Sequence, residues 1–161
     1  MFKLKPCDLN YIKTATCYFE NQIDIASPPE TIFQVISLTH EYPWIPYFKS
    51  SSWLPPGIPA VGGKRKIKTA YLTVIDEIMV FEPPKRLCYW VCESSLRLHS
   101  QLASDYLLTP LSSGQTRLTW RIYCTPYPFL KLLYPLINFL LGRDFKKGCE
   151  NIKAICEKKQ D

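Results

Sequence analysis

Arg65, Glu77 and His99 are the side chains in the middle of this chain whose types could support chemistry. Removing a proton next to a carbonyl needs a base and a donor for the enolate oxygen inside a dry pocket, and these groups can fill such roles. No Ser/His/Asp order or HExxH motif reinforces them. Gly62-Gly63-Lys64 superficially suggests a phosphate loop, but it leads into a strand and not into a helix N-terminus. The three residues are therefore weak catalytic candidates.

Arg65 belongs to a basic strand, 64–69, in which side chains alternate between two faces. It shares its face with an isoleucine and a threonine, whereas the three lysines face the other way. We expect Arg65 at the sheet edge in water, because arginine is seldom fully buried. If it points into a cavity instead, it needs Glu77, Glu93, Asp105 or an acidic ligand group as a partner.

His99 and His40 are the side chains whose unperturbed pKa lies near neutrality. His99 lies near an expected hairpin turn, and His40 follows the first expected helix. We expect both to be solvated loop residues.

The elements that must position these residues are mostly strands. Alternation and turn residues predict six or seven antiparallel strands, at about 16–25, 48–54, 64–69, 71–81, around 88–90, 100–109 and 115–125. In the last strand, Leu118, Trp120 and Ile122 share the apolar face. A helix should begin at Pro29 and extend to about Leu38. The segment 42–47 should follow as a short helical turn with exposed rings.

A long helix closes the chain after Pro128. Its second half has one apolar stripe and should dock on the sheet. In its first half, 129–141, apolar side chains cover nearly the whole circumference, although the segment is too short for a membrane span of about 20 residues. A cavity with its ligand, a partner subunit, a membrane interface or the body of the domain could cover it, the last being the simplest. Pro135 should bend or interrupt the helix, so that a hinged lid is conceivable.

Composition restricts the class of protein. The 161 residues fit one domain, and 47% apolar with 21% charged residues indicate an ordinary globule. The net charge of +6 favours anionic partners, including an anionic membrane surface. Nucleic acid is disfavoured, because a row of lysines along a strand is usually a solvated face.

Cysteine usage and the first residues bear on location and metal binding. Seven cysteines without framework spacing are typical of buried thiols in a reducing compartment, and no secretory signal begins the sequence, so we expect a cytoplasmic protein. With two histidines in the chain, we expect no metal site and no cofactor.

Several short motifs in this order resemble the START-like superfamily, which includes the birch-pollen-allergen fold, and within it the polyketide cyclase/dehydrase group. The motifs, which lie within about 16–157, are Ile25-Ala26-Ser27-Pro28-Pro29-Glu30-Thr31-Ile32-Phe33, Val61-Gly62-Gly63-Lys64-Arg65, Phe81-Glu82-Pro83-Pro84-Lys85-Arg86-Leu87 and Thr116-Arg117-Leu118-Thr119-Trp120. The resemblance implies an α+β helix-grip fold, in which a curved sheet wraps the C-terminal helix, two short helices follow the first strand, and an apolar cavity remains. The group's usual motifs are structural, so no catalytic residue carries over.

Three functions stay open. The preferred one is binding or transport of a hydrophobic or amphipathic small molecule, such as a lipid, quinone, sterol or polyketide. The second is an enzyme of the polyketide cyclase, dehydratase or aromatase type, and the third is an interaction protein that docks to a membrane or partner through 129–141. Candidate ligand-binding residues, besides Arg65, are Trp44, Tyr47, Trp53, Trp90, Tyr106, Trp120, Phe129, Leu133 and Ile137.

Overall fold

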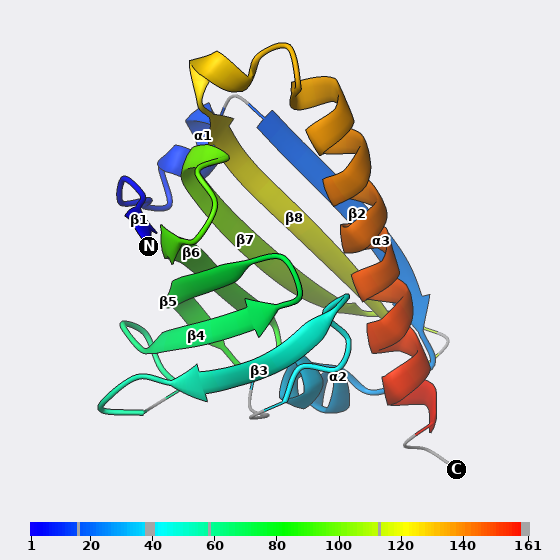
Figure 1. The fold of residues 1–161 in the computed structure, drawn as a ribbon. Coiled ribbons are helices and arrows are strands. Elements are labelled where there is room, and N and C mark those ends of the chain that lie inside the picture. Colours follow the sequence, from blue (N-terminus) through cyan, green and yellow to red (C-terminus); the bar gives the residue numbers. More distant parts are fainter. Residues whose placement is uncertain (16, 38–40, 58, 113, 159–161) are drawn as a thin grey trace.

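A curved antiparallel sheet partly encloses a long helix in the computed structural model of the protein (Figure 1). The structure describes residues 1–15, 17–37, 41–57, 59–112 and 114–158. His40 lies outside these residues. Figure 1 shows α3 crossing the open side of the sheet, whereas β1 and α1 lie near its opposite face.

Seven strands follow one another in the sheet in the order β2-β8-β7-β6-β5-β4-β3. Their bounds are Cys17–Ile25 (β2), Phe48–Trp53 (β3), Lys64–Thr69 (β4), Thr73–Glu82 (β5), Arg86–Ser94 (β6), His99–Pro110 (β7) and Thr116–Pro126 (β8). All neighbouring pairs are antiparallel. A short further strand, β1 (Phe2–Lys3), pairs with the end of β6. The predicted helix-grip sheet is confirmed.

The helices are α1 (Tyr11–Thr14), α2 (Pro29–Ser37), the 3-10 turn η1 (Pro128–Leu130) and α3 (Tyr134–Lys158). α2 begins at the predicted proline. The second short helix expected after it is instead a run of turns over 42–47. The expectation of exposed rings there is wrong for Tyr42 and Trp44, which are buried. They are buried because Tyr42 packs over the Arg65 guanidinium and Trp44 packs edge-on to Trp120.

The concave face of the sheet holds the main core, and Trp120 lies at its centre. As alternation predicts, Leu118, Trp120 and Ile122 all belong to this core. The Trp120 ring stacks on Tyr106 with ring centroids 4.8 Å apart and meets Phe145 of α3 edge-on at 5.2 Å. These contacts fix the distance between α3 and the sheet.

The two halves of α3 differ in burial. Cys149, Ile152 and Cys156 in the second half are buried, which confirms the predicted docking stripe. The first half does not follow the simplest expectation, because the body of the domain leaves several of its apolar side chains exposed. Pro135 does not bend a continuous helix. It lies in the first turn of α3, where a missing amide donor costs little, and separates that helix from η1.

The convex face of the sheet carries a second apolar cluster that the sequence did not predict. Cys7 and Tyr11 from the N-terminal segment are buried there against Ala103 and Tyr123 of the sheet. The Tyr11 hydroxyl lies 3.0 Å from the Thr125 hydroxyl. Residues 1–15 therefore form a cover for the outside of β6, β7 and β8.

Candidate functional site

A cavity of about 290 Å³ lies between the concave face, the turn 44–47 and α3. Its wall is mainly apolar and includes Phe19, Ile67, Val91, Leu102, Ile122 and Phe145. The volume is near the lower end of ligand pockets, which span about 300 to 1,000 Å³. The cavity suits a compact apolar molecule.

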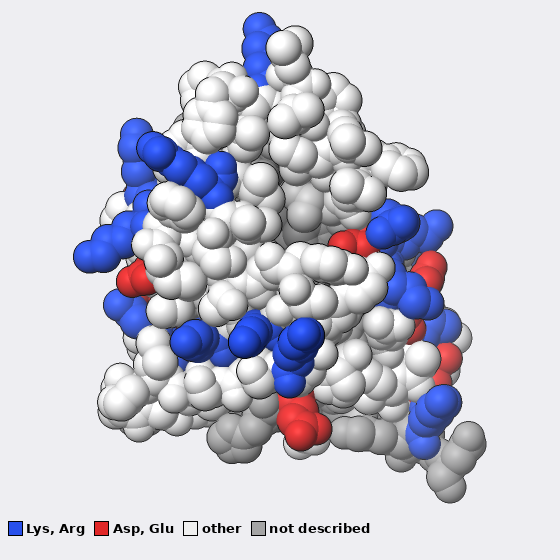
Figure 2. All heavy atoms as spheres, viewed as in Figure 1, with Lys and Arg blue, Asp and Glu red and all other residues white. Residues whose placement is uncertain are grey.

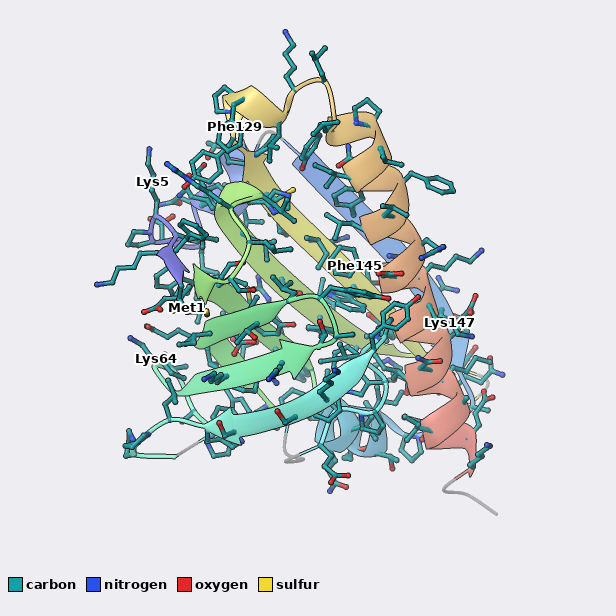
Figure 3. All side chains as sticks on the ribbon, in the orientation of Figure 1. Met1, Lys5, Lys64, Phe129, Phe145 and Lys147 are labelled. Atoms are coloured by element: carbon teal, nitrogen blue, oxygen red, sulfur yellow. The ribbon has the colours of Figure 1, made fainter. Side chains whose placement is uncertain are left out.

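Exposed side chains mark the mouth of the cavity. Tyr47 and Tyr71, whose ring centroids are 5.0 Å apart, line it on one side, and Leu96 of the β6–β7 loop lines it on another. Leu141 and Phe145 contribute the α3 side. Figure 3 shows Phe145 directed from α3 toward the sheet and Lys147 directed away. The mouth thus opens between α3 and two turns of the sheet.

The deep end of the cavity is polar, because Asp76 lies in its wall and is held there by Arg65. Arg65 Nη2 donates to Asp76 Oδ2 at 2.8 Å, and Arg65 Nε donates to Oδ1 at 3.1 Å. Both side chains are almost completely buried. The expectation of Arg65 in water is wrong, and its partner is none of the three acidic residues considered, because Asp76 is its direct neighbour in the β4–β5 register.

Aromatic rings complete the surroundings of Arg65. Its guanidinium carbon lies 4.6 Å from the centroid of Tyr42, 4.9 Å from Tyr89 and 5.8 Å from Trp53. Burial lowers the pKa of Arg65, but the Asp76 carboxylate and the neighbouring Tyr42 and Tyr89 together oppose it, and the net shift is upward. Burial raises the pKa of Asp76, and Arg65 opposes that rise. Arg65 and Asp76 therefore form a buried, bidentate ion pair, and aromatic rings surround the guanidinium group.

A chain of hydroxyl groups continues from this pair along the wall. The Tyr89 and Tyr106 hydroxyls are 3.0 Å apart, and Trp120 Nε1 donates to Ser104 Oγ at 2.7 Å. Burial raises the pKa of Tyr89 and of Tyr106, so both hydroxyls stay protonated near neutral pH. Of these groups, Tyr89 and Ser104 lie in the cavity wall, where they can form hydrogen bonds to a bound molecule without adding a charge.

His99 is a buried wall residue and not a solvated loop residue as expected. Its Nε2 lies 3.2 Å from the hydroxyl of Tyr134, which also lies 3.2 Å from Cys124 Sγ. Burial lowers the pKa of His99 from 6.5 to about 4. The neutral ring therefore joins the first turn of α3 to the sheet.

The predicted site residues separate into groups. Trp44, Tyr47, Trp120 and His99 line the cavity, with Arg65 directly behind Asp76. Tyr106 lies behind the wall, where it stacks on Trp120, and Trp53 contacts Arg65 from a half-buried position.

Other predicted residues lie away from the cavity. Glu77 pairs with Lys64 at 3.2 Å on the opposite face of the sheet, and Trp90 packs in the convex cluster. Phe129 and Leu133 are exposed and Ile137 is half-buried, and none of the three lies in the described cavity wall.

Asp76 and Leu4 are two of the many wall residues that sequence reasoning did not identify. Asp76 shares the alternation of Val74 and Ile78, so the period of β5 was a signal for its inward orientation. Leu4 also lines the cavity, and nothing in the sequence near it indicated this. Within the described ranges, no three His, Cys, Asp or Glu side chains gather in a way that could hold a metal ion.

The three catalytic candidates do not come together as a base and a donor in the cavity. Of the three catalytic candidates, Glu77 faces away from the cavity, Arg65 is neutralised by Asp76, and His99 is held by Tyr134. What remains is a mainly apolar chamber, whose polar lining residues include Asp76, Ser104, His99 and Asp144.

Comparisons with known proteins give the same fold. The family described as polyketide cyclase / dehydrase and lipid transport matches residues 16–157. Uncharacterised proteins of Mycobacterium tuberculosis and Mycobacterium bovis are 29% identical over 147 residues, which covers 86% of this chain and 87% of each relative.

Similar solved structures include XoxI from Bacillus cereus (TM-score 0.73, 17% identity, 91% of this chain and 99% of that one). A START superfamily protein from Mycobacterium smegmatis has a TM-score of 0.68 at 15% identity, covering 88% and 97% of the two chains. For Ara h 8.0201 the TM-score is 0.63 at 13% identity, with 84% and 97% covered. These likenesses establish the helix-grip fold.

No described helix is both long and apolar enough to cross a membrane.

Proposed function

Because the chain belongs to the polyketide cyclase / dehydrase and lipid transport family, a group of START-like ligand-binding domains, we propose that it binds one small amphipathic molecule in the cavity beneath α3. The apolar body of the ligand lies against the rings and branched side chains of the sheet. Transfer of that body from water supplies most of the affinity, at about 0.8 kcal/mol per buried methylene.

The observation that carries this proposal is the composition of the cavity wall. An apolar chamber with a few oriented polar groups is the usual form of a small-molecule site. Here those groups include Asp76, Tyr89 and Ser104 near the Arg65 ion pair, whereas exposed aromatic and aliphatic side chains, with the half-buried Asp144 of α3 beside them, form the mouth. A ligand therefore enters with its polar end first.

The ligand's polar group is a neutral hydrogen-bond donor, such as a hydroxyl or phenol. Asp76 presents a carboxylate to the cavity, which accepts hydrogen bonds and disfavours an anionic ligand group, and Arg65 holds it from behind. Hydrogen bonds to charged groups contribute about 1.5 to 3 kcal/mol. Methylation of the ligand hydroxyl should therefore weaken binding about 10- to 100-fold.

The test uses two neighbouring positions of β5 that face opposite ways. Val74 lines the cavity, and Ile75 does not. Val74→Trp should fill the chamber and abolish binding, whereas Ile75→Trp should leave binding intact. Native mass spectrometry of each gently purified protein would report a co-purified molecule. A titration with medium-chain alcohols and their methyl ethers, which suit the small cavity, would report affinity.

Equal binding by both variants would refute the cavity as the binding site. The polar end is tested separately with the double variant Arg65→Met/Asp76→Leu, which replaces the ion pair with apolar groups of similar size. Such replacements of buried pairs are often neutral or stabilising. The variant should therefore fold but lose the preference for alcohols over ethers. A retained preference would show that Asp76 does not bind the ligand.

A further inference from the structure

One end of the molecule exposes large apolar side chains that the rest of the described structure does not cover. Leu132 is 94% exposed, Phe139 68% and Phe129 65%, and Leu133, Leu136 and Leu140 are also exposed. We call these six residues the apolar tip. Figure 1 shows η1 and the beginning of α3 projecting past the end of the sheet.

The charges within the tip segment are positive, and the acidic residue that follows it, Asp144, lies one helical turn beyond Leu140 and pairs with Arg143 at 3.5 Å. Residues 126–143 contain Lys131 and Arg143 and no acidic side chain. Arg97 of the β6–β7 loop lies over the Tyr127 ring at 4.9 Å, and that ring stacks on Phe129 with centroids 5.5 Å apart. In Figure 2 this end of the molecule is white with one blue group at its extremity and without a red group.

The tip is continuous with the mouth of the cavity. Leu96 lines the mouth, while its neighbour Arg97 contacts the tip through Tyr127. On α3, Leu141 lines the cavity one residue after exposed Leu140. The segments 42–75 and 94–104, which border the mouth, contain no acidic residue, whereas α3 contributes the half-buried Asp144 to the wall. Any surface that covers the tip therefore comes close to the mouth.

We propose that the apolar tip docks into the surface of an anionic membrane. Leucine and phenylalanine side chains enter the boundary between headgroups and acyl chains, while Lys131 and Arg97 remain among the anionic headgroups. A second copy of the chain fits less well, because it would bring the same cations against these cations. Docking does not depend on the ligand-binding proposal, since none of the six tip residues lines the cavity.

Co-sedimentation of the full chain with vesicles tests the proposal. One vesicle preparation is phosphatidylcholine alone, and the other contains phosphatidylserine as well. The full chain should sediment with the anionic vesicles and much less with the neutral ones. Leu132→Asp/Leu136→Asp should lower binding to anionic vesicles by about 100-fold or more, because two inserted side chains are lost and two anions are added. Arg97→Ala and Lys131→Ala should each lower it about 5-fold on anionic vesicles only.

Val61→Asp is the matched control, since Val61 is 66% exposed in the β3–β4 loop, away from the tip. The Val61→Asp variant should bind vesicles like the unchanged chain. All variants should keep the thermal unfolding midpoint of the unchanged chain, because the substituted side chains are exposed. Equal binding by the tip variant and the control, or failure of the unchanged chain to bind anionic vesicles, would overturn the proposal. A concentration-dependent dimer that the tip variant loses, without vesicle binding, would assign the tip to a second copy instead.

Discussion

Arg65 forms a buried ion pair with Asp76, which lies in the cavity wall. A buried ion pair is costly to desolvate and contributes little net stability compared with apolar side chains of similar volume. Here the pair faces an otherwise apolar cavity, and three aromatic rings surround the guanidinium. Both oxygens of Asp76 are held by Arg65, so the carboxylate has a fixed orientation toward the chamber. Such orientation is useful for selecting a ligand and unnecessary for filling a core.

His99 should make the protein sensitive to acid. Burial lowers its pKa from 6.5 to about 4, so the unfolded state binds more protons than the native state between these values. The stabilisation is complete above about pH 6.5 and is lost as the pH falls toward 4. At 1.36 kcal/mol per pKa unit, the loss is roughly 3 kcal/mol. Urea unfolding at about pH 7.5 and about pH 4.5 measures it.

The comparison for this prediction is His99→Gln, which keeps a polar group near the Tyr134 hydroxyl and cannot titrate. Between the two pH values, the free energy of unfolding of this variant should fall less than that of the unchanged protein. The difference between the two falls should be roughly 2 to 3 kcal/mol. Carboxylates that titrate in the same range affect both proteins alike and cancel. Parallel pH curves for the two proteins would show that His99 does not carry this acid sensitivity.

At the scale of elements, two glycines of α3 have opposite surroundings. A Cβ atom on Gly148 would lie 2.8 Å from Cζ3 of Trp120, whose ring is held by Tyr106 and Phe145. Gly148→Ala should therefore destabilise the protein, because overpacking costs about 1 to 3 kcal/mol and exceeds the gain of about 1 kcal/mol in helix propensity. Urea unfolding would give the change in free energy.

Gly142 provides the matched control in the same helix. Nothing lies within 4 Å of a Cβ atom placed there, so Gly142→Ala should stabilise the protein by roughly 0.5 to 1 kcal/mol. If both substitutions stabilise the protein, α3 is free to move away from the sheet at Trp120. A loss at Gly142 would contradict the open surroundings of that position.

Strand alternation made much of the fold predictable, because burial on one face repeats every two residues. It correctly placed Trp120 inside, and it correctly oriented Arg65 relative to the lysines of β4. Alternation did not determine whether the inward face of β4 is exposed to solvent or buried, because burial depends on residues distant in the sequence, such as Tyr42. The partner of Arg65 required the β4–β5 register, which composition alone does not provide.

The candidate site was less predictable than the fold. Aromatic residues were predicted in the wall because small-molecule sites are mostly apolar, yet Trp90 lies on the convex face, since its position in β6 alternates with that of Tyr89 in the cavity wall. The apolar segment 129–141 correctly indicated an unusual environment. Whether a ligand, a partner subunit, a membrane or the body of the domain covers this segment depends on the shape of the whole molecule. The periodicity of the sequence does not determine that shape.

At the scale of the whole molecule, the sheet has apolar layers on both faces. The family match begins at residue 16, so the cover formed by residues 1–15 lies outside it. Leu4 N donates to the Cys92 carbonyl at 2.9 Å, and Lys5 N donates to the Ser100 carbonyl at 2.8 Å. These bonds fasten the segment across the ends of β6 and β7 and place Leu4 in the cavity wall. The cover therefore affects both faces of the sheet.

Removing residues 1–15 should destabilise the protein strongly, since it exposes the convex cluster and takes Leu4 out of the cavity wall. Burial of an apolar side chain contributes about 1.5 to 3 kcal/mol, so losing Leu4, Cys7 and Tyr11 should cost roughly 5 kcal/mol. The thermal midpoint should then fall by about 10 to 20 °C. Tyr11→Ala in the full chain should reproduce part of this loss, whereas Leu9→Ala should not, because Leu9 is exposed. If the truncated protein has the same thermal unfolding midpoint as the full chain, the convex face is stable without its cover. The effect of the segment would then be limited to the contribution of Leu4 to the cavity wall.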